Sequence, residues 1–403
     1  MPYNLAAPER DIEDLVVRPA QVFRDKQGIN LLTGYCVERI DPGKQTVSGV
    51  TLEGNHFEFP YDRLLIATGS AAVKPDLAGF EAPGVMVVKS LEDGRNIKNF
   101  LKNNHVKKTI IIGMGYIALE MCESLVGLNI AVDMVKPNPV FMPWLESSMA
   151  QTVREGLEAQ GVGVYAGHTV ERIEPFADGL KVICPDLTLI GDMVLVGIGV
   201  TPCSRIAETA GLKLGVQKSI AVDRNLRTSD NTIYAAGDCA DAYHVVTGEK
   251  TWIPLALRAN RSGWAVADNV CGKDVALAGV AGTSVFRVFD FEVARTGLSV
   301  SEAEKFGFVP VENMIKSGSK AHAHPGNTTI QVNLIGDKKS GRLLGAQMVG
   351  TEGVAHRING PAVALQSRMT VEQYSQADLA YAPPFGPTWD PTLTAANQLL
   401  KKL

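Results

Sequence analysis

The stretch Thr109–Lys136 constrains this chain more than any other, because it combines a strand, a glycine turn, a helix and a second strand. A β-branched apolar run leads into Gly113-x-Gly115-x-x-Ala118, and an apolar helix pattern follows directly. In such a unit the first glycine permits a tight turn, the second lets the backbone approach a pyrophosphate, and a small third residue keeps the helix close to the strand. The free N–H groups at the helix start favour a phosphate. The pattern predicts a nicotinamide dinucleotide site, and the alternative is a glycine-rich turn of another α/β protein.

The residue at the end of the second strand bears on the choice of cofactor. NAD sites usually place Asp or Glu there, where the carboxylate accepts hydrogen bonds from the adenosine ribose. Here the position holds Lys136, which cannot accept those bonds but can pair with a 2′-phosphate. The sequence therefore predicts a preference for NADPH over NADH. The alternative is a solvated surface lysine, with the choice made elsewhere.

Length and composition narrow the class of protein. A chain of 403 residues exceeds what one hydrophobic core usually serves, so we expect two or three domains. The net charge of −4 is spread without long runs of one sign, which favours neither nucleic-acid nor membrane-surface binding. No apolar run approaches the roughly 18–20 residues that span a bilayer, and the first residues do not resemble a signal peptide. We therefore expect a cytoplasmic protein.

Cysteines and histidines give no sign of disulfides or metal. Six cysteines are present, and no two of them form a CxxC pair. A chain of this length does not need disulfide staples, and no Cys/His spacing matches a metal site, so we predict no metal. The local pair His322 and His324 is more typical of a loop than of metal ligands.

Local patterns predict further elements along the chain. Residues 31–59 alternate short strand patterns with turns, which is typical of an antiparallel meander. From about residue 283 the pattern changes to that of a separate α+β domain. The expected strands are Leu64–Ala67, Thr232–Ala236, Ser284–Phe289, Thr329–Leu334 and Leu343–Val349, and the expected helices are residues 90–104, 147–160, 254–271, 300–306 and 353–367.

Three further segments have an order and spacing that resemble a family pattern. They are LLIATGS (Leu64–Ser70), VGIGVTPCSRIAETAGL (Val196–Leu212) and TIYAAGDCA (Thr232–Ala240). Together with the glycine turn they resemble the pyridine nucleotide–disulfide oxidoreductases with two dinucleotide-binding domains. The resemblance covers essentially the whole chain and is strongest to the branch of coenzyme A-disulfide reductases, NAD(P)H oxidases and polysulfide reductases.

The resemblance implies an α/β fold with two Rossmann-like dinucleotide-binding domains, the FAD domain being incomplete, and a C-terminal α+β dimerisation domain. The implied limits are residues 1–106 and 225–282 for the FAD-binding domain, which lacks its first βαβ unit. Residues 107–224 form the NAD(P)-binding domain and residues 283–403 the dimerisation domain. A homodimer is therefore expected.

The resemblance also assigns site residues. Tyr116 and Glu120 match family positions beside the contact between nicotinamide and flavin, and their alternative role is ordinary helix packing. The expected FAD contacts are Val37, Ala67, Thr68, Gly69, Gly237, Asp238, Pro254, Leu255 and Ala256. The expected NAD(P) contacts are Gly113, Gly115, Tyr116, Ile117, Ala118, Glu120, Lys136 and Gly199.

The segment ADLAYAPPFGPTWDP resembles the LAYAPPF signature of the branch. In that branch the C-terminal domain forms the dimer interface, and its tyrosine reaches the active site of the partner subunit. Tyr381 is the matching residue here and is the expected catalytic residue, since a phenol can donate to a thiolate, a sulfur anion or a bound peroxide. The alternative is a buried interface tyrosine.

The start of the chain departs from the family pattern. Relatives carry a flavin-binding unit and then a redox cysteine in a Cys-Gly-x-Pro-Tyr context, whereas this chain begins Met1-Pro2-Tyr3, so Met1 falls at the x. We expect the redox cysteine upstream of Met1, because none of the six cysteines matches its position: Cys36, Cys122, Cys184, Cys203, Cys239 and Cys271. A truncated gene model and a genuinely short protein are the two explanations. We expect the first, since loss of a central strand exposes sheet edges.

Smaller departures concern the substrate. His324 stands where many relatives have an aromatic residue, and Trp264 and Trp389 stand where relatives tend to have a cation. The expected function is FAD-dependent oxidation of NAD(P)H with reduction of a disulfide, a coenzyme A persulfide or polysulfide, or dioxygen. The alternative is a non-catalytic NAD(P)H-binding remnant.

Overall fold

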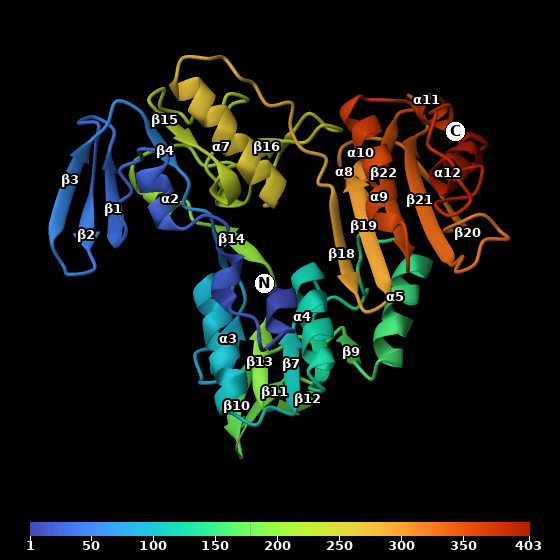
Figure 1. The fold of residues 1–403 in the computed structure, drawn as a ribbon, viewed down its shortest axis with the longest axis horizontal. Coiled ribbons are helices and arrows are strands. Elements are labelled where there is room, and N and C mark those ends of the chain that lie inside the picture. Colours follow the sequence, from blue (N-terminus) through green and yellow to red (C-terminus); the bar gives the residue numbers. More distant parts are fainter. Residues whose placement is uncertain (178) are drawn as a thin grey trace.

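A five-stranded parallel sheet organises the nicotinamide unit in the computed structural model, which describes residues 1–177 and 179–403 (Figure 1). Its central strands are buried on both faces, as the unbroken apolar run before Gly113 predicts. The strands in spatial order are β6 (Val85–Val87), β13 (Met193–Val196), β7 (Lys108–Ile112), β8 (Ala131–Lys136) and β9 (Gly163–Ala166). The associated helices are α3 (Leu91–Asn103), α4 (Tyr116–Gly127) and α5 (Ser147–Ala159). A small antiparallel sheet of β10 (Arg172–Phe176), β11 (Gly179–Ile183) and β12 (Thr188–Gly191) lies beside them.

The sheet topology differs from the expected limits of this unit, residues 107 and 224. Strand β6 pairs with β13, so the sheet includes residues before 107. After β13 the chain leaves the sheet. Strand β14 (Val200–Pro202) then pairs with β5 (Ser70–Ala72), which belongs to the unit expected to bind flavin, residues 1–106 and 225–282, here called the flavin side. The pairing partners β6 and β13 are about a hundred residues apart in sequence, which is why no local pattern indicates them.

The flavin side contains a short parallel pair, β4 (Leu64–Ile66) and β15 (Ile233–Ala235), with α7 (Ala256–Val270) nearby (Figure 1). The expected meander is confirmed as an antiparallel sheet of β1 (Tyr35–Asp41), β2 (Thr46–Thr51) and β3 (His56–Pro60). Short elements complete this side: α6 (Arg205–Thr209), the 3₁₀ turns η2 (Val216–Lys218) and η3 (Gly237–Cys239), β16 (Ala242–Tyr243) and β17 (Lys250–Thr251).

The N-terminal end forms three short helices, α1 (Pro2–Leu5), η1 (Ile12–Leu15) and α2 (Ala20–Asp25), of which α1 contacts α4 and α3, and η1 contacts α3. The Ser124 hydroxyl of α4 donates to the Pro2 carbonyl at 2.9 Å, which ties α1 to the nicotinamide unit. Throughout the described residues, no helix combines the length and the apolar character that crossing a membrane requires.

The C-terminal domain is a five-stranded antiparallel sheet flanked by helices, in agreement with the expected α+β domain (Figure 1). Two of its strands were not predicted, because their residues neither form an unbroken buried run nor alternate regularly between buried and exposed. The strands in spatial order are β18 (Ser284–Val288), β19 (Phe291–Gly297), β22 (Leu343–Gly350), β21 (Thr329–Asp337) and β20 (Pro310–Gly318). The helices are α8 (Val300–Lys305), α9 (Val354–Arg357), α10 (Asn359–Gln366), α11 (Val371–Ser375) and α12 (Pro391–Leu400).

The predicted single helix over residues 353–367 is wrong, since the structure divides it into α9 and α10 at Ile358. Pro361 lies one turn after the end of α9 and has no N–H group to donate to the Arg357 carbonyl. The regular helical hydrogen-bond ladder is therefore interrupted where α9 ends.

Candidate functional site

The glycine turn between β7 and α4 is shaped by close contacts on one side. Gly113 has φ +115°, and a Cβ atom at this position would lie 2.3 Å from the carbonyl oxygen of Gly197. Ala118 is fully buried and lies 3.1 Å from the place of a Cβ at Gly197. Both residues are therefore required to be small by the protein's own packing, as the sequence pattern predicts.

Gly115 is different, because nothing in the fold demands a glycine there. Its φ of −79° suits any residue, and a Cβ atom would meet no heavy atom within 4 Å. It precedes the first residue of α4, and no side chain caps the helix, so the first N–H groups of α4 have no acceptor within the helix. This open, uncapped helix start fits a pyrophosphate.

The flavin-side turn at Gly237 and Asp238 follows β15 directly. Gly237 has φ +77°, a conformation that favours glycine. The Asp238 Oδ2 atom accepts hydrogen bonds from the Ser70 hydroxyl at 2.9 Å and from Lys89 Nζ at 3.0 Å. The Asp238 side chain remains 19% exposed. A carboxylate held in this way fits the ribityl hydroxyl of a flavin.

Buried side chains from two later segments support this turn. Arg258 of α7 donates to the carbonyl oxygens of Gly237 at 3.1 Å and Ala240 at 2.8 Å. The Trp252 indole donates to the Asp238 carbonyl at 2.8 Å, and the Ser262 hydroxyl accepts from the Gly237 N–H. The polar backbone groups of this turn are thus largely bound by the protein itself.

The turn Ala67–Gly69 lies at the end of β4, beside the segment that joins the two units. The Thr68 hydroxyl donates to the Cys203 carbonyl at 2.5 Å, and the Cys203 N–H donates to the Gly69 carbonyl at 2.9 Å. Gly69 and Gly199 both have positive φ, and neither would place a Cβ atom near another group. Gly69 precedes β5 and Gly199 precedes β14, so both glycines leave open space where these two paired strands join the units.

Tyr116 and Glu120 lie one turn apart on α4, directly after the nicotinamide turn. Burial raises the pKa of the Tyr116 phenol, and the negative charges of Asp238 and Glu120 raise it further. The charge of Asp238, in the flavin-side turn, thus acts on a residue of the nicotinamide-side helix. Burial also raises the pKa of Glu120, whose Oε1 atom accepts a 3.0 Å hydrogen bond from the Tyr3 hydroxyl.

Lys136 is the last residue of β8, at the strand end where the sequence places it. Its Nζ atom donates to the Val140 carbonyl at 2.9 Å, and burial lowers its pKa. The amine is therefore engaged by its own loop, and binding of a 2′-phosphate requires it to leave that carbonyl.

The remaining expected residues lie at the start of α7, on β1, in the C-terminal domain and on α4. Leu255 caps α7 without a side-chain hydrogen bond, so this helix start, with Pro254 and Ala256, also presents free N–H groups. Val37 lies on β1 in the outer meander and is 41% exposed. Tyr381 lies in the loop before α12 of the C-terminal domain and is 49% exposed. Ile117, on the first turn of α4, is 37% exposed.

Sequence reasoning missed several side chains that shape the site. Each lies between 14 and 168 residues from the group that it binds, and they are Tyr3, Ser70, Lys89, Trp252, Arg258 and Ser262. Ser70 and Lys89, for example, are 168 and 149 residues from Asp238. No local spacing could have indicated those contacts.

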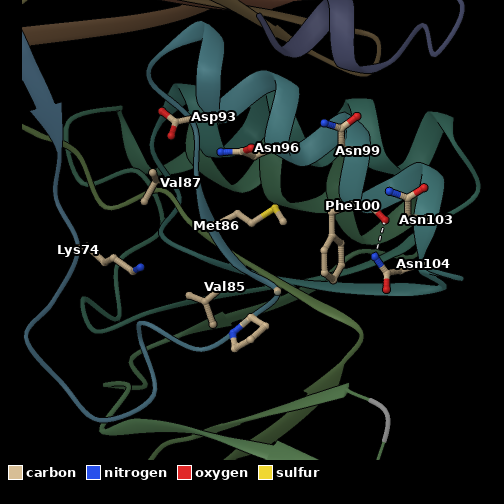
Figure 2. Close-up of a pocket in the computed structure, with 12 residues that line it drawn as sticks. Lys74, Val85, Met86, Val87, Asp93, Asn96, Asn99, Phe100, Asn103 and Asn104 are labelled. Atoms are coloured by element: carbon tan, nitrogen blue, oxygen red, sulfur yellow. Dashed lines mark hydrogen bonds between the residues drawn. The ribbon is translucent and has the colours of Figure 1, made fainter. Parts of the chain in front are cut away.

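A surface hollow of about 580 Å³ lies apart from these turns, between α3 and β6 (Figure 2). The amides of Asn96, Asn99 and Asn103 project from α3 along its rim, and the Phe100 ring points from the helix toward β6. The Asn104 side chain donates to the Phe100 carbonyl at 2.9 Å. None of the expected cofactor contacts lines this hollow.

Comparison with known families gives two matches that divide the chain as the fold does. A family described as pyridine nucleotide-disulphide oxidoreductase matches residues 2–263. The dimerisation domain of the same family matches residues 283–391.

Individual relatives are similar along nearly the whole chain. The NAD(P)H sulfur oxidoreductase (CoA-dependent) of Pyrococcus furiosus is 33% identical over 388 residues, which cover 96% of this chain and 87% of that protein. The NADH oxidase of Methanocaldococcus jannaschii is 31% identical over 405 residues, covering 100% of this chain and 90% of that protein.

Solved structures confirm the expected fold class. The structure of a NAD-dependent persulfide reductase from A. fulgidus matches with a TM-score of 0.96 and 35% identity, covering 100% of this chain and 75% of that chain. The fold agrees with that of the relatives in three features: the glycine turn before α4, the flavin-side turn at Gly237 and Asp238, and the separate C-terminal sheet. The chain belongs to the pyridine nucleotide-disulphide oxidoreductase family.

Proposed function

We propose that this chain catalyses the FAD-dependent oxidation of NAD(P)H and passes the electrons to a sulfur compound. The acceptor class is a disulfide, a coenzyme A persulfide or a polysulfide. One observation carries the proposal: the helix start at Gly115 is open and uncapped, and the Asp238 carboxylate of the other turn is near enough to the adjoining Tyr116 to raise the pKa of its phenol. The names of the relatives from Pyrococcus furiosus and A. fulgidus support the acceptor class.

On the nicotinamide side, the start of α4 would hold the pyrophosphate, because its N–H groups are free and Gly115 leaves room. Tyr116 would cover the nicotinamide, since its ring is 43% exposed at the helix start and lies beside Phe286, with ring centroids 6.4 Å apart. Glu120 would accept a hydrogen bond from the carboxamide, and the Tyr3 hydroxyl orients its carboxylate.

On the flavin side, Asp238 would bind a ribityl hydroxyl, and the free N–H groups at the start of α7 would face a flavin carbonyl oxygen. FAD supplies, when bound, the two-electron chemistry that no side chain in this site provides. The protein's part is to bind both nucleotides, to orient them and to keep water out.

Tyr381 would donate a proton to the sulfur acceptor in the active site of a second copy of the chain. Its position in the dimerisation domain and its exposed side chain support this role. A phenol with an ordinary hydrogen-bonding capacity can donate to a sulfur anion. The protein would therefore work as a homodimer.

We also propose a preference for NADPH, supported by the cation at the end of β8. Lys136→Glu should lower kcat/KM for NADPH about tenfold relative to NADH, because it replaces a charge-assisted hydrogen bond with repulsion. Lys102→Glu, at an exposed position of α3, is the matched control and should leave the ratio unchanged. A wild-type protein with a strong preference for NADH would refute this proposal.

The acceptor is tested by steady-state kinetics on the purified protein. NADPH oxidation that depends on added coenzyme A disulfide or polysulfide, and that greatly exceeds oxygen uptake, supports the sulfur reductase. Oxygen uptake without any sulfur acceptor would instead support an NAD(P)H oxidase, the second candidate, which the NADH oxidase relative favours. Protein that binds NADPH without flavin and oxidises nothing would support the non-catalytic alternative.

A further inference from the structure

Arg357, the last residue of α9, makes four hydrogen bonds with one guanidinium. Its Nε atom donates to Asp390 Oδ2 at 2.9 Å, and Nη1 donates to the Gly353 carbonyl at 3.2 Å. Its Nη2 atom donates to the carbonyl oxygens of Ser319 at 3.0 Å and Phe385 at 2.7 Å. The Arg357 side chain is only 10% exposed. A cation this deeply buried is stabilised only while its acceptors stay in place.

Those acceptors tie together two segments, residues 319–328 and 381–390, which we call the paired loops. A backbone hydrogen bond from the Ala321 N–H to the Pro383 carbonyl, at 3.1 Å, also joins them. Asp390 closes the second loop by capping α12, with its Oδ1 atom accepting from the backbone two residues on. The paired loops are therefore one unit, and Arg357 is at its centre.

The second of the paired loops presents aromatic side chains to the outside. Tyr381 is 49% exposed, Phe385 79% and Trp389 62%. Exposed aromatic rings on a well-anchored loop are typical of interaction surfaces. The loops adjoin β20 and α12, which lie together at the outer edge of the C-terminal domain (Figure 1). The dimerisation-domain match, residues 283–391, contains both loops, so the partner that this surface fits is a second copy of the chain.

We propose that Arg357 is a positioning residue that locks the paired loops together and so holds Tyr381 where it meets a second copy of the chain. The inference rests on the role of Tyr381 in the proposed function. Arginine is required because its planar fork reaches both paired loops at once, whereas a lysine amine at the same place would serve mainly Asp390.

The locking is tested by amide hydrogen exchange on Arg357→Lys, which keeps the charge and removes the fork. Exchange should rise about tenfold or more in both paired loops, because hydrogen bonds to a charged group are lost, while β21 stays protected. Arg368→Lys, at an exposed position of the same domain, is the matched control and should leave exchange unchanged. Loosening of one loop alone, or of neither, would overturn the proposal.

The positioning of Tyr381 is tested by sedimentation of the same two variants over a range of concentrations. Arg357→Lys should weaken self-association by about tenfold or more, whereas Arg368→Lys should match the wild type. An Arg357→Lys protein that associates as tightly as the wild type overturns the inference, and so does a wild-type protein that stays monomeric.

Tyr381→Phe separates this inference from the proposed function. If it slows reduction of the sulfur acceptor while the paired loops stay protected, both stand. If it leaves acceptor reduction unchanged, the proton-donor role of Tyr381 fails, and exchange and sedimentation still decide whether Arg357 locks the loops.

Discussion

The two glycine turns of the site, Gly113–Ala118 and Gly237–Asp238, are built in opposite ways. The first leaves its polar groups open, since the helix start at Gly115 has no cap and faces free space. The second is bound by the protein, with Arg258 and Ser262 taking up its backbone groups. The comparison indicates that the nicotinamide turn is shaped for a ligand, whereas the flavin-side turn is also a structural centre. Substitution of Gly115, the open position of the first turn, should therefore change mainly binding, whereas loss of the side chains that support the second turn should change stability.

The largest effect is expected for Arg258→Met on the flavin side. Arg258 is 7% exposed, and its loss removes the hydrogen bonds that it donates to the carbonyl oxygens of Gly237, Ala240 and Asp241. The free energy of unfolding should fall by about 3–5 kcal/mol, measured by urea denaturation. Arg261→Met, at an exposed position of the same helix, should change it by less than about 0.5 kcal/mol. Equal stability of both variants would remove the structural half of the comparison.

The next effect concerns the nicotinamide turn. Gly115→Val fills the space left for the pyrophosphate, so the Kd for NADPH should rise about a hundredfold, roughly 3 kcal/mol. The free energy of unfolding should change by no more than about 1 kcal/mol, the cost of valine at an N-cap, because a Cβ atom here meets no heavy atom within 4 Å and φ is ordinary. Gly127→Val, at the other end of α4 and equally open, is the control and should bind NADPH normally. Unfolding of Gly115→Val instead would show that this turn is structural as well.

The flavin side should also be the more sensitive to acid. His244 is 6% exposed, its Nδ1 atom accepts from the Val246 N–H, and burial lowers its pKa to about 4. The charge of Glu302 raises this pKa and that of Arg295 lowers it, both less than burial does.

Because the folded protein binds a proton to His244 less readily than the unfolded chain, stability is lost as pH falls from about 6.5 toward 4. Between pH 7 and 5 this group should cost about 2 kcal/mol, measured by urea denaturation at both values. His244→Asn keeps an acceptor for the Val246 N–H without a titrating ring. Its free energy of unfolding should therefore fall about 2 kcal/mol less than that of the wild type between pH 7 and 5. An identical pH dependence in both proteins would contradict the assignment.

The smallest effect is expected for Lys89→Met on the flavin side. This change removes a charge that binds the Asp238 carboxylate but leaves the hydrogen bonds to the backbone of the turn intact, so it separates ligand binding from stability in this turn. Lys89 fixes the orientation of the Asp238 carboxylate through its 3.0 Å ion pair. Retention of FAD should weaken about tenfold, measured by flavin absorbance after dialysis, with little change in stability. Lys102→Met, at an exposed position on α3, is the matched control. Full flavin retention would mean that Ser70 alone orients Asp238.

The same contrast explains what could be predicted from the sequence. The nicotinamide turn was predictable because its signal is local: strand, glycines and helix follow one another within thirty residues. The support of Asp238 was not, since Ser70 and Lys89 reach it across more than a hundred residues and no spacing rule links them. Gly237–Asp238 itself was found only through its resemblance to a family segment.

In the C-terminal domain, strands with regular apolar patterns were predicted and irregular ones were missed. β22 is buried along its whole length and was found, whereas β20, at the sheet edge, is half-buried throughout and was not. The role of Arg357 was likewise not predictable from the sequence, because its acceptors lie in two loops, 28 to 38 residues away from it. The parts that depend on distant contacts required the structure.

Anaerobic titration of the purified protein with NADPH, followed by flavin absorbance, tests most directly whether the two turns serve one reaction. The account predicts that the wild-type flavin is bleached stoichiometrically, and that Gly115→Val retains its flavin but is bleached only at far higher NADPH concentrations. A Gly115→Val protein that is bleached at the wild-type NADPH concentration would contradict it.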